Sequence, residues 1–174
     1  MRSFQIENIK TFMEQLLLRD AFDGFELVSA SVTTFAAFTI DGRRQKNYSA
    51  YATAGTGSGS GRSAGSNEDP GTPAAAGAPS VSFVPWPMIR PAILGLIRGH
   101  VRPENMKLVL KLSPDSPAAA SVDPAHQADL FLNILYDGTH LECRSGLSLA
   151  VFTLDRSLTE AWDSHIAHYL APYM

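Results

Sequence analysis

The chain has 174 residues, and its 14 lysines and arginines against 17 aspartates and glutamates give a formal net charge of −3. Apolar residues make up 45% and charged residues 18% of the chain, close to the globular average, which excludes a wholly disordered or fibrous protein. The mild negative charge gives no support to a protein that coats duplex DNA, because such proteins carry a clearly basic domain or stripe.

The single cysteine, Cys143, excludes an intramolecular disulfide framework and favours a reducing compartment. The first residues do not resemble a signal peptide, because Glu7, Asn8 and Glu14 interrupt the region that would have to be apolar. No apolar run approaches the roughly 20 residues that a bilayer crossing needs. We therefore expect a cytoplasmic protein without a membrane partner.

The first elements are a short strand at residues 2–6 and an amphipathic helix that ends near Leu18, as the spacing of apolar residues indicates. From Phe25 the pattern is that of strands, and it includes FAAFTI at residues 35–40. The Asp41-Gly42 pair that follows predicts a type I′ hairpin turn, because both central residues of such a turn have positive φ.

Residues 52–80 are almost entirely Gly, Ser, Ala, Thr and Pro. Such a segment cannot bury enough apolar surface to offset the cost of ordering, which is roughly 1–2 kcal/mol per residue for the backbone. Its glycine-dense part, residues 55–66, is not a phosphate loop, because no lysine occurs between Asn47 and Met106. We expect one domain, residues 1–174, interrupted by a disordered insertion at about 52–80.

A second amphipathic helix follows Pro85-Trp86-Pro87, and Gly99 is placed to cap it. Pro91 fits this helix only within its first turn, where the missing N–H is no loss. Next we expect a strand at residues 106–112 and then a loop, SPDSPAAASVDPAHQ.

Strands then continue to Leu154, with a hairpin turn at Asp137-Gly138 and another turn at Ser145-Gly146. A capping box, Ser157-Leu158-Thr159-Glu160, announces the last helix. The expected fold class is α+β, a mostly antiparallel sheet with the helices packed on one face, with a DNA-clamp-like arrangement as an option.

Candidate catalytic residues lie on the last helix, where His165 and His168 are neighbours at i, i+3 and Asp163 is close by. The structural alternative is a histidine at the rim of the buried stripe. His140 and Cys143 are not a metal pair, because a strand directs them to opposite faces and zinc needs four convergent ligands. We expect no metal and no cofactor.

Arg90, Arg98 and Arg102 form a basic segment around the second helix and are the candidate nucleic-acid-binding residues, because guanidinium groups engage phosphate oxygens. The structural alternative is a solvated helix face whose positive charge lies near the helix C-terminus, where the helix dipole favours it.

Four segments, SFQIENIKTFMEQLLL, FTIDG, MIRPAILGLIRG and FTLDRSLTEAWD, resemble a small bacterial family known only as a domain of unknown function. This resemblance spans nearly the whole chain outside the insertion and implies no activity. MRSFQIENIKTFMEQLL and DGTHLECRSGLSLAVFTL also resemble the opening strand and helix and the closing hairpin of one DNA sliding-clamp domain. The clamp resemblance implies helices that face DNA, although clamp chains join two or three such domains and lack the terminal helix.

Three classes of function follow. The first is a non-catalytic binding or assembly module with a protein partner or a second copy, because each catalytic signature has a structural explanation. The second is a single-domain sliding-clamp relative associated with nucleic acid. The third is a small enzyme with an unrecognised site, although the balance is against an enzyme.

Overall fold

The computed structural model describes residues 1–45, 82–98, 102–125, 127–149, 151 and 155–174. The disordered insertion expected at 52–80 and the Gly99 cap lie outside these residues. Residues 1–43 and 83–174 form one compact unit, to which the description below applies. A second unit, 44–82, contributes only residues 44, 45 and 82 to the described part. The single-domain organisation stays a prediction.

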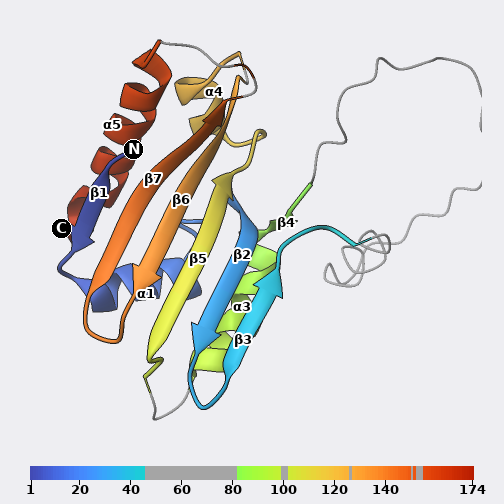
Figure 1. The fold of residues 1–174 in the computed structure, drawn as a ribbon, viewed down its shortest axis with the longest axis vertical. Helices are drawn as coiled ribbons and strands as arrows, with labels where there is room; N and C mark the ends of the chain where they lie inside the picture. Colours follow the sequence, from blue (N-terminus) through green and yellow to red (C-terminus); the bar gives the residue numbers. More distant parts are fainter. Residues whose placement is uncertain (46–81, 99–101, 126, 150, 152–154) are drawn as a thin grey trace, which may run out of the picture. The chain divides into compact units, whose positions relative to one another are not determined.

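An antiparallel sheet of seven strands is the frame of the unit (Figure 1). The strand order is β1-β7-β6-β5-β2-β3, and β4 also pairs with β2. The strands are β1 (Ser3–Ile6), β2 (Phe25–Thr33), β3 (Ala37–Asp41), β4 (Val84–Pro85), β5 (Asn105–Leu112), β6 (Ala128–Tyr136) and β7 (Leu141–Leu149).

Helices cover one face of this sheet, and they are α1 (Ile9–Leu18), α3 (Trp86–Ile97), α4 (Pro117–Val122) and α5 (Ser157–Leu170), followed by a 3₁₀ turn, η1 (Ala171–Tyr173). Figure 1 shows α1 and α3 behind the sheet, with α3 behind β2 and β3. The indole nitrogen of Trp86 donates to the carbonyl oxygen of Leu16 at 2.9 Å and so joins α3 to α1. Among the described helices, none combines the length and apolar character that a membrane crossing requires.

The period of two along each strand explains why the helices lie on one face. On β5, Met106, Leu108 and Leu110 are buried, whereas Lys107 between them is exposed. The helices complete the core with side chains that are almost fully buried: Phe12, Leu16, Trp86, Ile93, Trp162, Ile166 and Leu170. Each such side chain contributes roughly 1.5–3 kcal/mol through its burial. The expected α+β class, with helices on one face of an antiparallel sheet, is confirmed.

The hairpin turn predicted at Asp41-Gly42 is wrong, because the chain continues past Gly42 beside β4. The amide of Gly42 donates to the carbonyl of Val28 at 3.0 Å, and the amide of Val84 donates to the carbonyl of Gly42 at 2.8 Å. A Cβ atom at residue 42 would lie 1.7 Å from the carbonyl oxygen of Leu27. The glycine therefore serves the close approach of two backbones, and not a turn with positive φ.

The hairpins lie elsewhere. β2 turns into β3 at residues 34–36, where the amide of Thr34 donates to the carbonyl of Ala36 at 3.0 Å. The turn predicted at Ser145-Gly146 is wrong, because β7 runs unbroken through these residues. The turn at Asp137-Gly138 is confirmed, and Gly138 has a φ of +95°.

Three details of the helices also differ from the prediction. Pro91 lies in the second turn of α3, since this helix begins at Trp86. The capping box of α5 is wrong, because the carboxylate of Asp155 accepts both the amide and the hydroxyl of Ser157 at 2.9 Å. Helix α4 occupies the expected loop, and its Ser116-Pro117 start is a normal cap and first residue: the Ser116 hydroxyl accepts from the amide of Ala119 at 3.2 Å.

Candidate functional site

The candidate catalytic residues of α5 do not converge. Asp163 accepts a hydrogen bond from the hydroxyl of Ser145 on β7, and its other oxygen lies 3.0 Å from the backbone nitrogen of Met1. His165 stacks instead on Trp162, with ring centroids 5.6 Å apart and ring planes at 11°. His168 is exposed. Asp163 is therefore engaged with the β1–β7 edge, while His165 belongs to an aromatic stack.

The chemistry of His165 follows from this stack, which Tyr169 extends at a centroid distance of 6.3 Å. Burial lowers the pKa of His165 below its ordinary value of 6.5, and the neighbouring His168 lowers it further. Both effects favour the neutral form of the imidazole. Asp163, which would have to orient a catalytic histidine, is instead engaged by the Ser145 hydroxyl and the Met1 nitrogen.

The three candidate arginines are also separated in role. Arg90 is 19% exposed, donates to Asp23 at 2.8 Å and also donates to the carbonyl of Arg19. It therefore fastens α3 to the segment that follows α1. Arg98 ends α3 and Arg102 precedes β5, and both are exposed.

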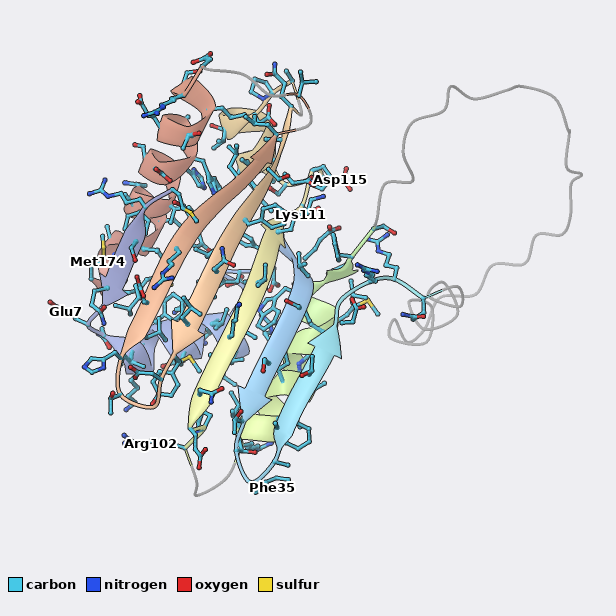
Figure 2. The ribbon with its side chains drawn as sticks, viewed as in Figure 1. Glu7, Phe35, Arg102, Lys111, Asp115 and Met174 are labelled. Carbon is cyan, nitrogen blue, oxygen red and sulfur yellow. The ribbon has the colours of Figure 1, made fainter. Side chains whose placement is uncertain are left out.

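Arg102 lies at the end of the sheet where β5 begins, as Figure 2 shows. It lines a hollow of about 510 Å³ together with Lys10, Tyr136 and Thr139. The outward side of α3 carries Met88, Pro91, Ala92 and Gly95, which are exposed and uncharged. This side of α3 thus presents no cation to DNA phosphates.

A groove that the sequence did not suggest lies on the open face of the sheet, beside the β6–β7 turn. Its volume is about 560 Å³, and its polar lining includes Lys107, Asp137, His140, Glu142 and Arg144. Arg144 binds both oxygens of Glu142, at 3.0 and 2.7 Å, and so lowers the pKa of this carboxyl. The amides of His140 and Thr139 likewise lower the pKa of Asp137. Arg144 therefore offsets the charge of Glu142, while the amides keep Asp137 ionised.

The outer edge of β3 is the second feature that the sequence analysis missed. Within the described residues, β3 pairs only with β2. In an antiparallel pair, residues whose backbone groups bond to the neighbouring strand alternate with residues whose backbone groups point away from it. The Gly42–Val28 and Thr34–Ala36 hydrogen bonds therefore establish which residues of β3 bond to β2. Phe38 and Ile40 direct their backbone groups toward β2. Ala37, Thr39 and Asp41 direct theirs outward.

An exposed aromatic pair lies at the start of this edge. Phe35 is 89% exposed, and its ring contacts that of Phe38 edge-to-face at 5.6 Å and 78°. The sequence signal for the edge was FAAFTI followed by Asp41, a run without lysine or proline, which are the residues that commonly protect edge strands. Recognising it required knowing that β3 ends the strand order.

No group of three potential metal ligands occurs among the residues that the structure describes. In comparisons with known proteins, the model of a family of unknown function, DUF5721, matches residues 15–60 and 72–173. A search of curated proteins and a search of solved structures each found no match. The likeness to a sliding clamp stays a prediction.

Proposed function

Because the chain belongs to DUF5721, a family of unknown function, we propose its role from its geometry: it is a non-catalytic binding or assembly module that accepts an added strand along the outer edge of β3. The observation that carries this proposal is the row of outward backbone groups on Ala37, Thr39 and Asp41. A strand that pairs there gains affinity from main-chain hydrogen bonds and specificity from alternate side chains.

The composition of β3 supports this role. Edge strands are commonly blunted by lysine, proline, a bulge or short length. The five residues of β3 include neither lysine nor proline, and Asp41 at the end is their only charge. Phe38 and Ile40 are half-buried on the helix side, so an added strand could cover them. The separation of Asp163 from His165 supports a module without catalysis.

A photo-crosslinking residue tests the proposal in cells that make the protein. Benzoylphenylalanine at position 39 would lie on the outer edge of β3, and at position 5 it would lie on the opposite edge strand, β1, as the matched control. We expect an adduct at position 39 whose crosslinked peptide is identified by mass spectrometry, and little adduct at position 5. Equal yields at the two positions, or none at position 39, would contradict strand addition at β3.

A single-domain clamp relative is the second candidate, because α1 and α3 lie side by side on one face of the sheet, as the resemblance implies. Counterion release would then make DNA affinity fall steeply with salt. Binding to a DNA duplex should weaken when Arg98 and Arg102 are both changed to Glu. The absence of binding at low salt, or binding that salt does not change, would exclude this candidate.

A further inference from the structure

We propose that the strand added to β3 is β3 of a second copy of this chain, paired antiparallel about a two-fold axis at Thr39. The inference rests on the proposed function and names the partner of that same edge. It follows from the register that the outward groups of β3 allow, from the faces on which its side chains lie and from the position of its one charge.

The backbone supplies the first step. With the axis at Thr39, this residue lies opposite Thr39 of the second copy, and Ala37 lies opposite Asp41. Ala37, Thr39 and Asp41 are the residues whose N–H and C=O groups point away from β2. Every one of these groups then meets a partner, since directly opposed residues of this type exchange both of their bonds. A shift of two residues in either direction leaves the groups at one end unpaired.

The side chains supply the second step. In this register Phe38 lies opposite Ile40 of the second copy, and both are on the helix side of the sheet, where they are half-buried. Apolar side chains therefore meet apolar side chains, and the polar side of β3 continues into the polar side of its partner. Cross-strand pairs of aromatic and β-branched residues stabilise antiparallel strands.

Charge does not oppose this pairing. The two Asp41 residues would lie four positions apart along the strands, about 14 Å at ~3.4 Å per residue. This separation exceeds the Debye length of about 8 Å at physiological ionic strength, so their repulsion is largely screened. Phe35, which is 89% exposed and contacts Phe38, flanks the paired segment.

The opposite edge of the sheet, β1, offers fewer outward backbone groups for strand pairing. β1 has four residues, and the bond from the amide of Ser145 to the carbonyl of Arg2 sets its alternation, which leaves Ser3 and Gln5 pointing outward. Two outward residues provide fewer bonds than the three of β3. An isologous contact through β3 closes at two copies, whereas pairing of β1 with β3 would propagate.

Cysteine variants test the register directly. In an antiparallel pair of this type, opposed Cα atoms are about 5.5 Å apart, within the ~4.4–6.8 Å range of disulfides. We therefore expect Thr39→Cys to form a disulfide-linked dimer under mild oxidation. Ala37→Cys should not, because the two residues 37 would be about 14 Å apart. The native Cys143 is buried and does not interfere. Equal crosslinking of the two variants would overturn the proposed axis.

Proline variants test the assembly itself. Thr39→Pro and Gln5→Pro each remove one outward amide from an edge strand, so they are matched in chemistry. Sedimentation equilibrium of the full chain should give a dimer for the wild type and for Gln5→Pro, and a monomer for Thr39→Pro. Circular dichroism and thermal melting establish that both variants fold. A wild-type monomer at every concentration, or a dimer that Thr39→Pro leaves intact, would overturn the inference.

The two proposals fail in different ways. If the wild type is a monomer but benzoylphenylalanine at position 39 crosslinks to another protein, the partner is not a second copy and strand addition still holds. If position 39 gives no more adduct than position 5, strand addition at β3 is wrong, and so is the dimer.

Discussion

At one end of the sheet, Trp86 of α3 donates its indole N–H to the carbonyl of Leu16, and toward the other end Trp162 of α5 donates to the carbonyl of Phe131. Both indoles are almost fully buried, so at each end of the sheet a tryptophan side chain holds a helix in place. Their edges differ. Asp163 of α5 bonds to Ser145 beside β1, whereas β3 has three residues whose backbone groups point away from β2, and within the described residues β3 pairs with no other strand. Within the described residues, polar contacts close the β1 edge, and no strand covers the outer edge of β3; the proposed strand addition rests on this difference.

The largest effect should come from the two tryptophans. Trp86→Ala and Trp162→Ala should each lower the free energy of unfolding by about 3–5 kcal/mol, because both changes create a cavity and leave a carbonyl without its donor. Urea denaturation followed by circular dichroism measures this. Similar losses in the two variants would indicate that the core is packed equally well at both ends of the sheet. A loss at Trp86 much smaller than at Trp162 would show that the β3 end is loosely packed.

Substitution of Gly42 should have the next largest effect on stability. At this residue the chain leaves β3, and β4 takes its place as the strand that pairs with β2. Gly42→Ala places a Cβ atom 1.7 Å from the carbonyl oxygen of Leu27, and this backbone atom can move only with β2. We expect a loss of about 1–3 kcal/mol in the free energy of unfolding, the usual cost of overpacking. The control is Gly95→Ala, where the new Cβ atom meets nothing within 4 Å. Helix propensity should make that variant more stable by about 0.5–1 kcal/mol.

Two aspartates allow a comparison of the sheet edge at β1 with the sheet edge at β3. Asp163→Ala removes one acceptor of the buried Ser145 hydroxyl, which can still donate to the carbonyl of Arg2, so we expect a loss of about 0.5–1.5 kcal/mol. Asp41→Ala changes an exposed carboxylate and should alter the stability by less than about 0.5 kcal/mol. Thermal melting of the two variants measures both effects. Equal losses would mean that the edge of β3 is as firmly tied as that of β1.

Local patterns predicted most of this fold, and long-range pairings account for what they missed. The helical spacing of Leu158, Trp162, Ile166 and Leu170 indicates α5, and one face of each strand follows from alternation. Gly42 was misread because a glycine after aspartate is a normal hairpin signal, whereas its actual neighbour, Leu27, lies 15 positions away. Likewise, the contact of Asp163 with Ser145 could not be inferred from spacing along α5. The open edge of β3 required the strand order, which no local pattern supplies.

The smallest effect should be the pH dependence of stability that comes from His165 on α5. Burial against Trp162 lowers its pKa below 6.5, so the unfolded chain binds this proton more readily than the folded protein does. Stability should therefore be complete above pH 6.5 and decrease as the pH falls toward the lowered pKa. His165→Phe keeps an aromatic ring in the stack and should remove this part of the dependence. His168→Asn should retain most of it, because burial is the larger cause and the charge of His168 the smaller. Thermal melting between pH 5.5 and 8, a range above the titration of most carboxylates, measures the three proteins. If the pH profile of stability is unchanged in His165→Phe, another group is responsible for it. The end of the sheet at α5 would then have no pH dependence that comes from His165.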